Sequence, residues 1–194
     1  MIILLSGNSQ TGKTYMAQNL LETYKIPYYS IDHLKMGIYR ANASCGFTPM
    51  DSNKHIGDHL WPIVKGIIMT AIENHQSLCM EGCYIFPHYL QELEQSYLDN
   101  IIPVFLGYSN RYITENYEEK ILKYRDIIEV RGELTPEDTS AATIEEYLKE
   151  NDVFRRSCAA AGEKFFEIDR SYEDEISHVY AYIANRSGKK IGFK

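Results

Sequence analysis

Short apolar runs alternate along the chain with longer stretches of helical periodicity. Five runs are rich in β-branched, aromatic or other apolar residues and are bounded by glycine, proline or polar residues, so we expect buried strands. They are residues 1–5, 28–31, 78–80, 101–107 and 164–168. Strands that alternate with helices are typical of a mainly parallel sheet with helices on both faces and ligands at the carboxyl edge of the strands.

Between these runs, apolar residues recur at the spacing of one helix face. A first helix begins at Lys13, and a longer apolar stripe over residues 56–74 is wide enough to cover a face of the sheet. Pro62 interrupts this stripe, so the helix is expected either to begin near Pro62 or to bend there. The last helix is predicted from about Tyr172 to Asn185.

A long insertion separates the fourth and fifth predicted strands, from Arg111 to Gly162. Its pattern predicts two helices around a Gly/Pro break at residues 131–136, which could form a mobile lid. No repeat or linker indicates a second domain. We therefore expect one domain over residues 1–194, with the lid insertion at about 111–162.

The composition is that of an ordinary globular protein, with 194 residues, 44% hydrophobic and 24% charged. A formal net charge of -7 argues against a general binder of nucleic acid or membrane surfaces, so neither is an expected partner. The four cysteines lack zinc-ligand spacing and are expected to be reduced thiols. With no signal or membrane segment in the sequence, we expect a cytoplasmic monomer or homodimer.

The first predicted strand leads into a complete G-x-x-x-x-G-K-S/T pattern, the phosphate loop. Its residues are Gly7, Asn8, Ser9, Gln10, Thr11, Gly12, Lys13 and Thr14. Backbone N–H groups at the start of a helix favour a polyphosphate, and glycines let the backbone approach it closely. Lys13 is expected to reach the β and γ phosphates of a nucleotide, and the Thr14 hydroxyl to ligate Mg²⁺.

Two carboxylates follow the next predicted strands at the same edge of the sheet. Asp32 is a candidate general base or acceptor-binding residue, although an aspartate there could equally be a helix N-cap. Glu81 ends the third strand and could hold Mg²⁺ or orient a hydroxyl group, with an N-cap or a surface ion pair as the alternative. Arg40 could bind an anionic acceptor if the helix after Asp32 is continuous.

Several arginines lie in or near the predicted lid. Arg125, Arg131 and Arg155 are the candidates for contacting a transferring phosphoryl group through bidentate hydrogen bonds. A closed lid would also exclude water that otherwise hydrolyses ATP. For each arginine taken alone, a solvated position on a helix surface remains the alternative.

The phosphate loop together with residues 30–32 and 80–87 resembles the small P-loop kinases, which include shikimate, gluconate and adenylate kinases. Residues 80–87 are also similar to 2-phosphoglycerate kinase-like proteins. The resemblance implies a P-loop NTPase fold, three layers α/β/α, with a five-stranded parallel sheet in the order 2-3-1-4-5. It also implies ATP with Mg²⁺ and an arginine-bearing helical lid. Adenylate kinases usually have Asp at the position of Glu81, so a hydroxylated metabolite or a nucleoside is at least as good a candidate acceptor as a nucleotide.

These features predict an ATP-dependent kinase that transfers the γ-phosphoryl group to a small-molecule acceptor. Lys13, Asp32 and Glu81 are the expected catalytic residues, together with the three lid arginines. The alternative is a non-catalytic nucleotide-sensing module, or a slow ATPase switch, that acts on a protein partner. A GTPase is less expected because the chain has no N-K-x-D element for reading guanine.

Overall fold

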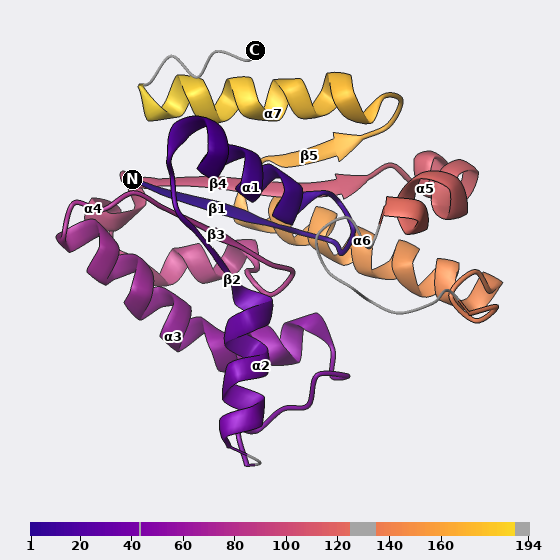
Figure 1. The fold of residues 1–194 in the computed structure, drawn as a ribbon, viewed down its shortest axis with the longest axis horizontal. Coiled ribbons are helices and arrows are strands. Elements are labelled where there is room, and N and C mark those ends of the chain that lie inside the picture. The colour runs from indigo at the N-terminus through magenta and orange to yellow at the C-terminus, as the bar shows by residue number, and fades with distance from the viewer. Residues whose placement is uncertain (43, 125–134, 189–194) are drawn as a thin grey trace.

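A single five-stranded sheet forms the centre of the computed structural model, which describes residues 1–42, 44–124 and 135–188 (Figure 1). The strands are β1 (Ile2–Gly7), β2 (Tyr28–Ser30), β3 (Leu78–Glu81), β4 (Ile101–Tyr108) and β5 (Phe165–Ile168). All neighbouring strands are parallel, in the order β2-β3-β1-β4-β5. This order confirms the predicted sheet.

Helices cover both faces of the sheet. They are α1 (Lys13–Tyr24), α2 (Ile31–Ala41), α3 (Asn53–Glu73), α4 (Gln95–Leu98), α5 (Asn110–Asn116), α6 (Ala141–Ala161) and α7 (Tyr172–Ser187). Shorter helical segments are η1 (Pro87–Glu92), η2 (Tyr117–Ile121) and η3 (Leu122–Tyr124). No helix of the described residues is long and apolar enough to span a membrane.

Alternate residues of β1 separate the two layers of the core. Ile3 and Leu5 pack into the cluster that includes α1 and α7, whereas Ile2 and Leu4 pack into the cluster that includes α3. In Figure 1, α1 and α7 accordingly lie on one side of the sheet, and α3 and α6 lie on the other. Every residue of β1 is buried, as expected for the central strand of a sheet that is covered on both faces.

Helix α3 runs through Pro62 without ending, so of the two predicted alternatives, a helix that begins near this proline is wrong. Proline cannot donate the backbone hydrogen bond that would reach the carbonyl of Asp58, one turn earlier. Both residues are exposed, so water can hydrate that carbonyl. The buried residues Trp61 and Val64 hold the helix against the core on either side of the proline.

The second strand is one residue shorter than predicted, because Ser30 ends β2 and Ile31 begins α2. Asp32 therefore lies in the first turn of α2, and Ser30 occupies the N-cap position. The N-cap alternative for Asp32 is thus wrong. A carboxylate in this first turn still interacts favourably with the helix dipole.

Helix α6, the second helix of the predicted insertion, belongs to the covering layer of the sheet. Its residues Phe154 and Cys158 are buried in the core cluster on the α3 side. A lid formed by the insertion would therefore have to come from residues before α6. Of these, residues 125–134 lie outside the described part of the chain, so the predicted break is described only at residues 135–136.

Candidate functional site

The phosphate loop connects β1 to α1 at the carboxyl edge of the sheet, and two of its glycines are required by close contacts. Gly7 has φ of 125°, and a Cβ atom there would lie 1.9 Å from the carbonyl oxygen of Leu106. Gly12 has φ of 78° and is the N-cap residue of α1. A Cβ atom on Gly12 would lie 1.7 Å from the hydroxyl of Tyr172, so neither position accepts a side chain without rearrangement.

Asn8 holds the first half of the loop. Its backbone N–H donates to the carbonyl of Leu106 at 3.1 Å, and its side-chain oxygen accepts from the backbone N–H of Ser9 at 2.9 Å. Its side-chain Nδ2 donates to the carbonyl of Tyr147 in α6 at 3.1 Å. Asn8 is fully buried, so these bonds fix the loop between β4 and α6.

The ammonium group of Lys13 is buried within the loop. Its Nζ atom donates to the carbonyl of Asn8 at 2.5 Å and to Oγ1 of Thr11 at 3.3 Å. The side chain is 5% exposed, and both of these partners are uncharged oxygen atoms of the loop itself. A buried cation that contacts neutral acceptors can interact strongly with an anion that enters the loop.

Glu81 at the end of β3 contacts the start of α1. Its Oε2 atom accepts a 3.2 Å hydrogen bond from the hydroxyl of Thr14, whereas its Oε1 atom is buried without a hydrogen-bond partner. Burial raises the pKa of the Glu81 carboxyl above its usual value, although the side chain of Ser30 and the charge of Lys13 act in the opposite direction. A buried oxygen without a partner is costly unless something else satisfies it.

This pair of side chains fits a magnesium ion. Carboxylate and hydroxyl oxygens are the ligand types that Mg²⁺ prefers, and Mg²⁺ usually keeps several waters when few protein ligands are present. Within the described residues there is no group of three or more His, Cys, Asp or Glu that could hold a metal ion. Thr14 and Glu81 would therefore hold the ion together with water and phosphate oxygens.

Asp32 lies in a closed triad with Lys35 and Tyr84. Its Oδ1 atom accepts from Nζ of Lys35 at 2.9 Å and from the hydroxyl of Tyr84 at 2.8 Å, while Lys35 also donates to Tyr84 at 2.5 Å. Burial alone would raise the pKa of the Asp32 carboxyl. The hydrogen bond and charge of Lys35, the hydrogen bond of Tyr84 and the charge of Lys13 act in the opposite direction, and the pKa is lowered overall. Asp32 is therefore an ionised hydrogen-bond acceptor.

The sequence did not single out Lys35, and it gave no site role to Tyr84. The spacing from Asp32 to Lys35 places both residues on one helix face, which is a signal that could have been used. The contact of Tyr84 depends on the path of the chain after β3 and has no local signal. The pairing of Ser30 with Glu81 in the β2–β3 register brings the triad and Glu81 to neighbouring strand ends.

Not every predicted site residue joins this group. Arg40 is exposed in the last turn of α2, about 12 Å along the helix axis from Asp32. Arg155 forms an ion pair with Glu167 on β5 and donates to the carbonyl of Tyr108 at 3.2 Å. The roles of these two arginines stay predictions. The other candidates, Arg125 and Arg131, lie outside the described residues.

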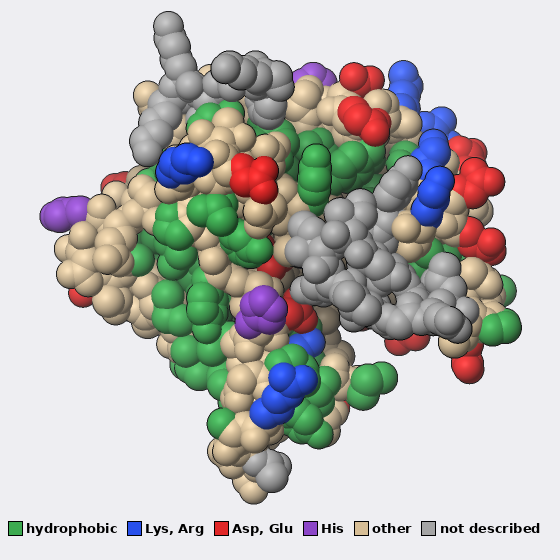
Figure 2. Space-filling view, viewed as in Figure 1, with side chains coloured by type: hydrophobic (Ala, Val, Ile, Leu, Met, Phe, Trp, Pro, Cys, Tyr) green, Lys and Arg blue, Asp and Glu red, His purple; other side chains and the backbone are tan. Residues whose placement is uncertain are grey.

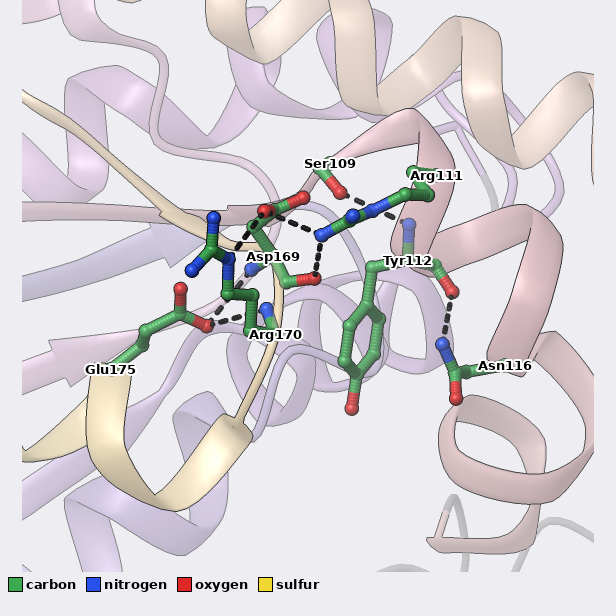
Figure 3. A network of polar contacts seen from close by, with 7 residues as sticks. All are labelled: Ser109, Arg111, Tyr112, Asn116, Asp169, Arg170 and Glu175. Atoms are coloured by element: carbon green, nitrogen blue, oxygen red, sulfur yellow. Dashed lines mark hydrogen bonds and ion pairs between the residues drawn. The ribbon is translucent and has the colours of Figure 1, made fainter.

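A polar network joins the first turn of α5, which follows β4, to the turn between β5 and α7 (Figure 3). The guanidinium of Arg111 donates to the Asp169 carboxylate at 2.7 Å and to its carbonyl at 3.2 Å. The carboxylate of Glu175 accepts from the backbone N–H groups of Asp169 and Arg170 at 2.9 and 3.2 Å. These contacts link the segment that follows Tyr108 to the segment that precedes Tyr172.

Charges of both signs are mixed on the surface of the protein (Figure 2). On the face shown in Figure 2, Lys and Arg side chains are interspersed with Asp and Glu and form no broad basic patch among the described residues. This distribution agrees with the net charge of -7. Within the loop, Lys13 supplies a positive charge that could act on a polyphosphate.

No protein-family model and no curated protein sequence matches this chain. Solved structures are similar to it in fold. Shikimate kinase from Aquifex aeolicus is 13% identical with a TM-score of 0.54, and covers 96% of this chain and 98% of its own. A gluconokinase from Sinorhizobium meliloti is 15% identical with a TM-score of 0.52, and covers 95% of this chain and 91% of its own. An uncharacterised protein from Eubacterium ventriosum is 17% identical with a TM-score of 0.54. The match covers 95% of this chain and 98% of that protein. The chain thus has the fold of the small P-loop kinases.

Proposed function

We propose that this protein is an ATP-dependent kinase that transfers the γ-phosphoryl group to a small hydroxylated acceptor. One observation carries the proposal: the phosphate loop and the two carboxylates predicted from separate strand ends lie in one site. Thr14 of the loop is hydrogen-bonded to Glu81, and Glu81 pairs across the sheet with Ser30, two residues before Asp32. The charge of Lys13 favours the ionised form of both carboxyls, although burial raises the pKa of Glu81 overall. Donor-binding and acceptor-binding groups are thus close enough to act on one ligand.

The donor half of the reaction uses the loop. Its backbone N–H groups and the N-terminus of α1 would bind the phosphates, and Lys13 would exchange its loop carbonyl for a phosphate oxygen. Thr14 and Glu81 would hold Mg²⁺, which neutralises charge on the phosphates. The burial of Lys13 and Glu81 strengthens these electrostatic interactions compared with those in water.

Asp32 would bind the acceptor hydroxyl. Its low pKa keeps it charged and makes it a strong hydrogen-bond acceptor, but a weak base before reaction begins. Phosphoryl transfer has a loose transition state in most analyses, so positioning the hydroxyl contributes more than early removal of its proton. Lys35 and Tyr84 fix the Asp32 carboxylate and leave its Oδ2 atom for the acceptor.

The proposed acceptor is a small molecule with at least one free hydroxyl group. Two structures with this fold are named for kinases of shikimate and gluconate, and this supports a hydroxylated metabolite as the acceptor. Lys35 contributes a buried positive charge beside Asp32, so an acceptor that also carries an anionic group is compatible with the site. Nucleosides are the second class to test.

Acceptor-dependent release of ADP tests this function. The protein is incubated with ATP, Mg²⁺ and mixtures of hydroxylated metabolites and nucleosides, and ADP is measured for each mixture. The proposal predicts that at least one mixture raises ADP release well above the rate without acceptor. Tight ATP binding with the same slow ADP release in every mixture would favour the nucleotide-sensing or slow ATPase alternative.

A further inference from the structure

Three tyrosine side chains from different parts of the chain meet the outer side of the phosphate loop. They come from the end of β4, from α6 and from the start of α7. Each hydroxyl donates a hydrogen bond to a backbone carbonyl of the loop: Tyr147 to Ser9 at 2.7 Å, Tyr108 to Gln10 at 3.0 Å and Tyr172 to Thr11 at 3.3 Å. The three carbonyls belong to successive residues, so three successive peptide groups are held.

This pattern determines the direction of the loop N–H groups. In a planar trans peptide, the C=O and the following N–H point in opposite directions. Because the carbonyls of Ser9, Gln10 and Thr11 point toward tyrosine hydroxyls, the N–H groups of the residues that follow them point away from those hydroxyls. A loop binds phosphate through N–H groups presented on one side, with the carbonyls turned away from the anion.

The tyrosine rings are themselves held in place. Tyr108 stacks on Tyr112 with ring centroids 5.0 Å apart, and Tyr147 packs edge-on against Tyr117 at 5.3 Å. The hydroxyl of Tyr172 lies where a Cβ atom of Gly12 would be, so this tyrosine packs directly on the loop. Each hydroxyl therefore has a fixed position before any ligand binds.

Further contacts fix the elements that carry the tyrosines. The side chain of Asn151 in α6 accepts from the backbone N–H of Tyr108 at 3.0 Å and donates to its carbonyl at 2.7 Å. The Arg111–Asp169 ion pair joins the first turn of α5, just after Tyr108, to the turn that precedes Tyr172 (Figure 3). The three donors are thus parts of one connected framework around the loop.

The hydroxyls also remain donors over the physiological pH range. Burial raises the pKa of Tyr108 and of Tyr147 well above the usual tyrosine value, and it raises the pKa of Tyr172 as well. A hydroxyl that keeps its proton continues to donate to a carbonyl. Changes of pH near neutrality are therefore not expected to release the loop.

We infer that Tyr108, Tyr147 and Tyr172 are positioning residues that hold the phosphate loop in its anion-binding shape by occupying three successive loop carbonyls. They act through the loop backbone and are not expected to touch the nucleotide. The inference rests on the proposed function only in naming a nucleotide polyphosphate as the ligand. The effect on the shape of the loop can be measured without any ligand.

Amide hydrogen exchange of the nucleotide-free protein tests this effect. Tyr108→Phe, Tyr147→Phe, Tyr172→Phe and the triple variant each keep the ring and remove only a hydroxyl. The matched control is Tyr89→Phe, since Tyr89 is also buried and donates a 2.7 Å hydrogen bond, but to Asp58 and not to the loop. We expect exchange in peptides covering residues 8–14 to be faster by about fivefold in each single variant, and unchanged in the control. Exchange at the parent rate in the triple variant would overturn the inference.

Binding of ATP with Mg²⁺, measured by calorimetry on the same variants, gives the second readout. We expect the Kd to rise about fivefold for each single variant and on the order of 50-fold for the triple variant, with little change for Tyr89→Phe. In turnover, KM for ATP should rise more than kcat falls. Unchanged Kd in the triple variant would overturn the inference while leaving the proposed function intact. If the parent protein does not bind ATP at all, the proposed function fails, and the exchange experiment still decides whether the tyrosines hold the loop.

Discussion

The hydroxyl of Thr14 donates a 3.2 Å hydrogen bond to Oε2 of Glu81, which joins the first turn of α1 to the end of β3. The other carboxylate oxygen of Glu81 is buried without a hydrogen-bond partner. Both residues were predicted as magnesium ligands from separate motifs, and the fold brings their side chains into contact. The site therefore combines two oxygen atoms of the kind that Mg²⁺ prefers with the nearby charge of Lys13.

Glu81→Gln is expected to weaken the effect of Mg²⁺ on nucleotide binding. The neutral amide keeps the shape of the side chain but removes the charge that would attract the ion. Loss of a group that supports a metal site typically costs about 10- to 100-fold in affinity, and we expect an Mg²⁺ requirement raised by this amount. Titration of Mg²⁺ at fixed ATP measures it by calorimetry.

The control for this experiment is Glu22→Gln, which changes an exposed carboxylate on α1 that accepts a hydrogen bond from Gln18. It should leave the Mg²⁺ titration unchanged. An Mg²⁺ requirement that is the same in Glu81→Gln and in the parent protein would remove Glu81 from the metal site.

Lys13→Ala should greatly reduce ATP binding without unfolding the protein. The ammonium donates to two uncharged loop oxygens and forms no direct ion pair in these contacts, although its charge also acts on Asp32 and Glu81. We expect a loss of about 100-fold or more in ATP affinity, since the lysine would contact the β and γ phosphates. Calorimetry measures binding, and thermal unfolding should show that the variant remains folded. Lys25→Ala, which changes an exposed lysine at the end of α1, serves as the control. Parent-like ATP binding by Lys13→Ala would contradict the proposed role of Lys13.

The lowered pKa of Asp32 predicts that the stability of the fold depends on pH. Its pKa is lowered in the folded protein, so the ionised carboxylate stabilises the fold at every pH above the unfolded value of about 3.9. This contribution is lost as the pH falls from about 4 through the lower pKa of the folded state. Urea unfolding from pH 7 to pH 2.5 should show the parent more stable than Asp32→Asn at neutral pH, with the difference shrinking below about pH 4. A difference that grows on acidification would mean that the folded pKa is raised instead.

Asn151→Leu should destabilise the whole domain. Asn151 is fully buried, and its amide pairs with both the N–H and the carbonyl of Tyr108. Leucine would leave the Tyr108 N–H without this partner in the core, although Arg155 still reaches the carbonyl. We expect a loss of about 2 to 4 kcal/mol in the free energy of unfolding, measured in urea. Asn100→Leu, at an exposed amide, should change it by less than about 0.5 kcal/mol, and an equally small effect at Asn151 would contradict this prediction.

The sheet and the main site residues could be predicted because their signals are local. Each strand is a short apolar run, and a carboxylate at a strand end must lie at the edge where the phosphate loop lies, once the sheet is parallel. The local pattern could not decide whether α3 begins at Pro62 or continues through it. Whether Pro62 ends a helix depends on whether the lost hydrogen bond faces solvent or core, and only the fold decides that.

The rest of the site depends on contacts between distant segments. Tyr84 is hydrogen-bonded to Asp32, which lies 52 residues away in the sequence, and Tyr147 is hydrogen-bonded to Ser9, which lies 138 residues away. No spacing rule covers such pairs, so the abundant tyrosines could not be separated into core and site residues. The apolar face of α6 was equally compatible with a lid and with a layer on the sheet. In the structure, Phe154 and Cys158 of α6 pack into the core, and the lid stays a prediction.

The fate of the γ-phosphoryl group tests the central claim most directly. Phosphorus NMR on mixtures of ATP, Mg²⁺ and an acceptor pool that supports ADP release would count phosphorylated acceptor, inorganic phosphate and ADP for the parent protein and for Asp32→Asn. The account predicts about one phosphorylated acceptor for each ADP in the parent, and a rate about 10²- to 10⁴-fold lower in Asp32→Asn with ATP affinity unchanged. ADP matched by inorganic phosphate, at a rate that is independent of the acceptor and of Asp32, would contradict it.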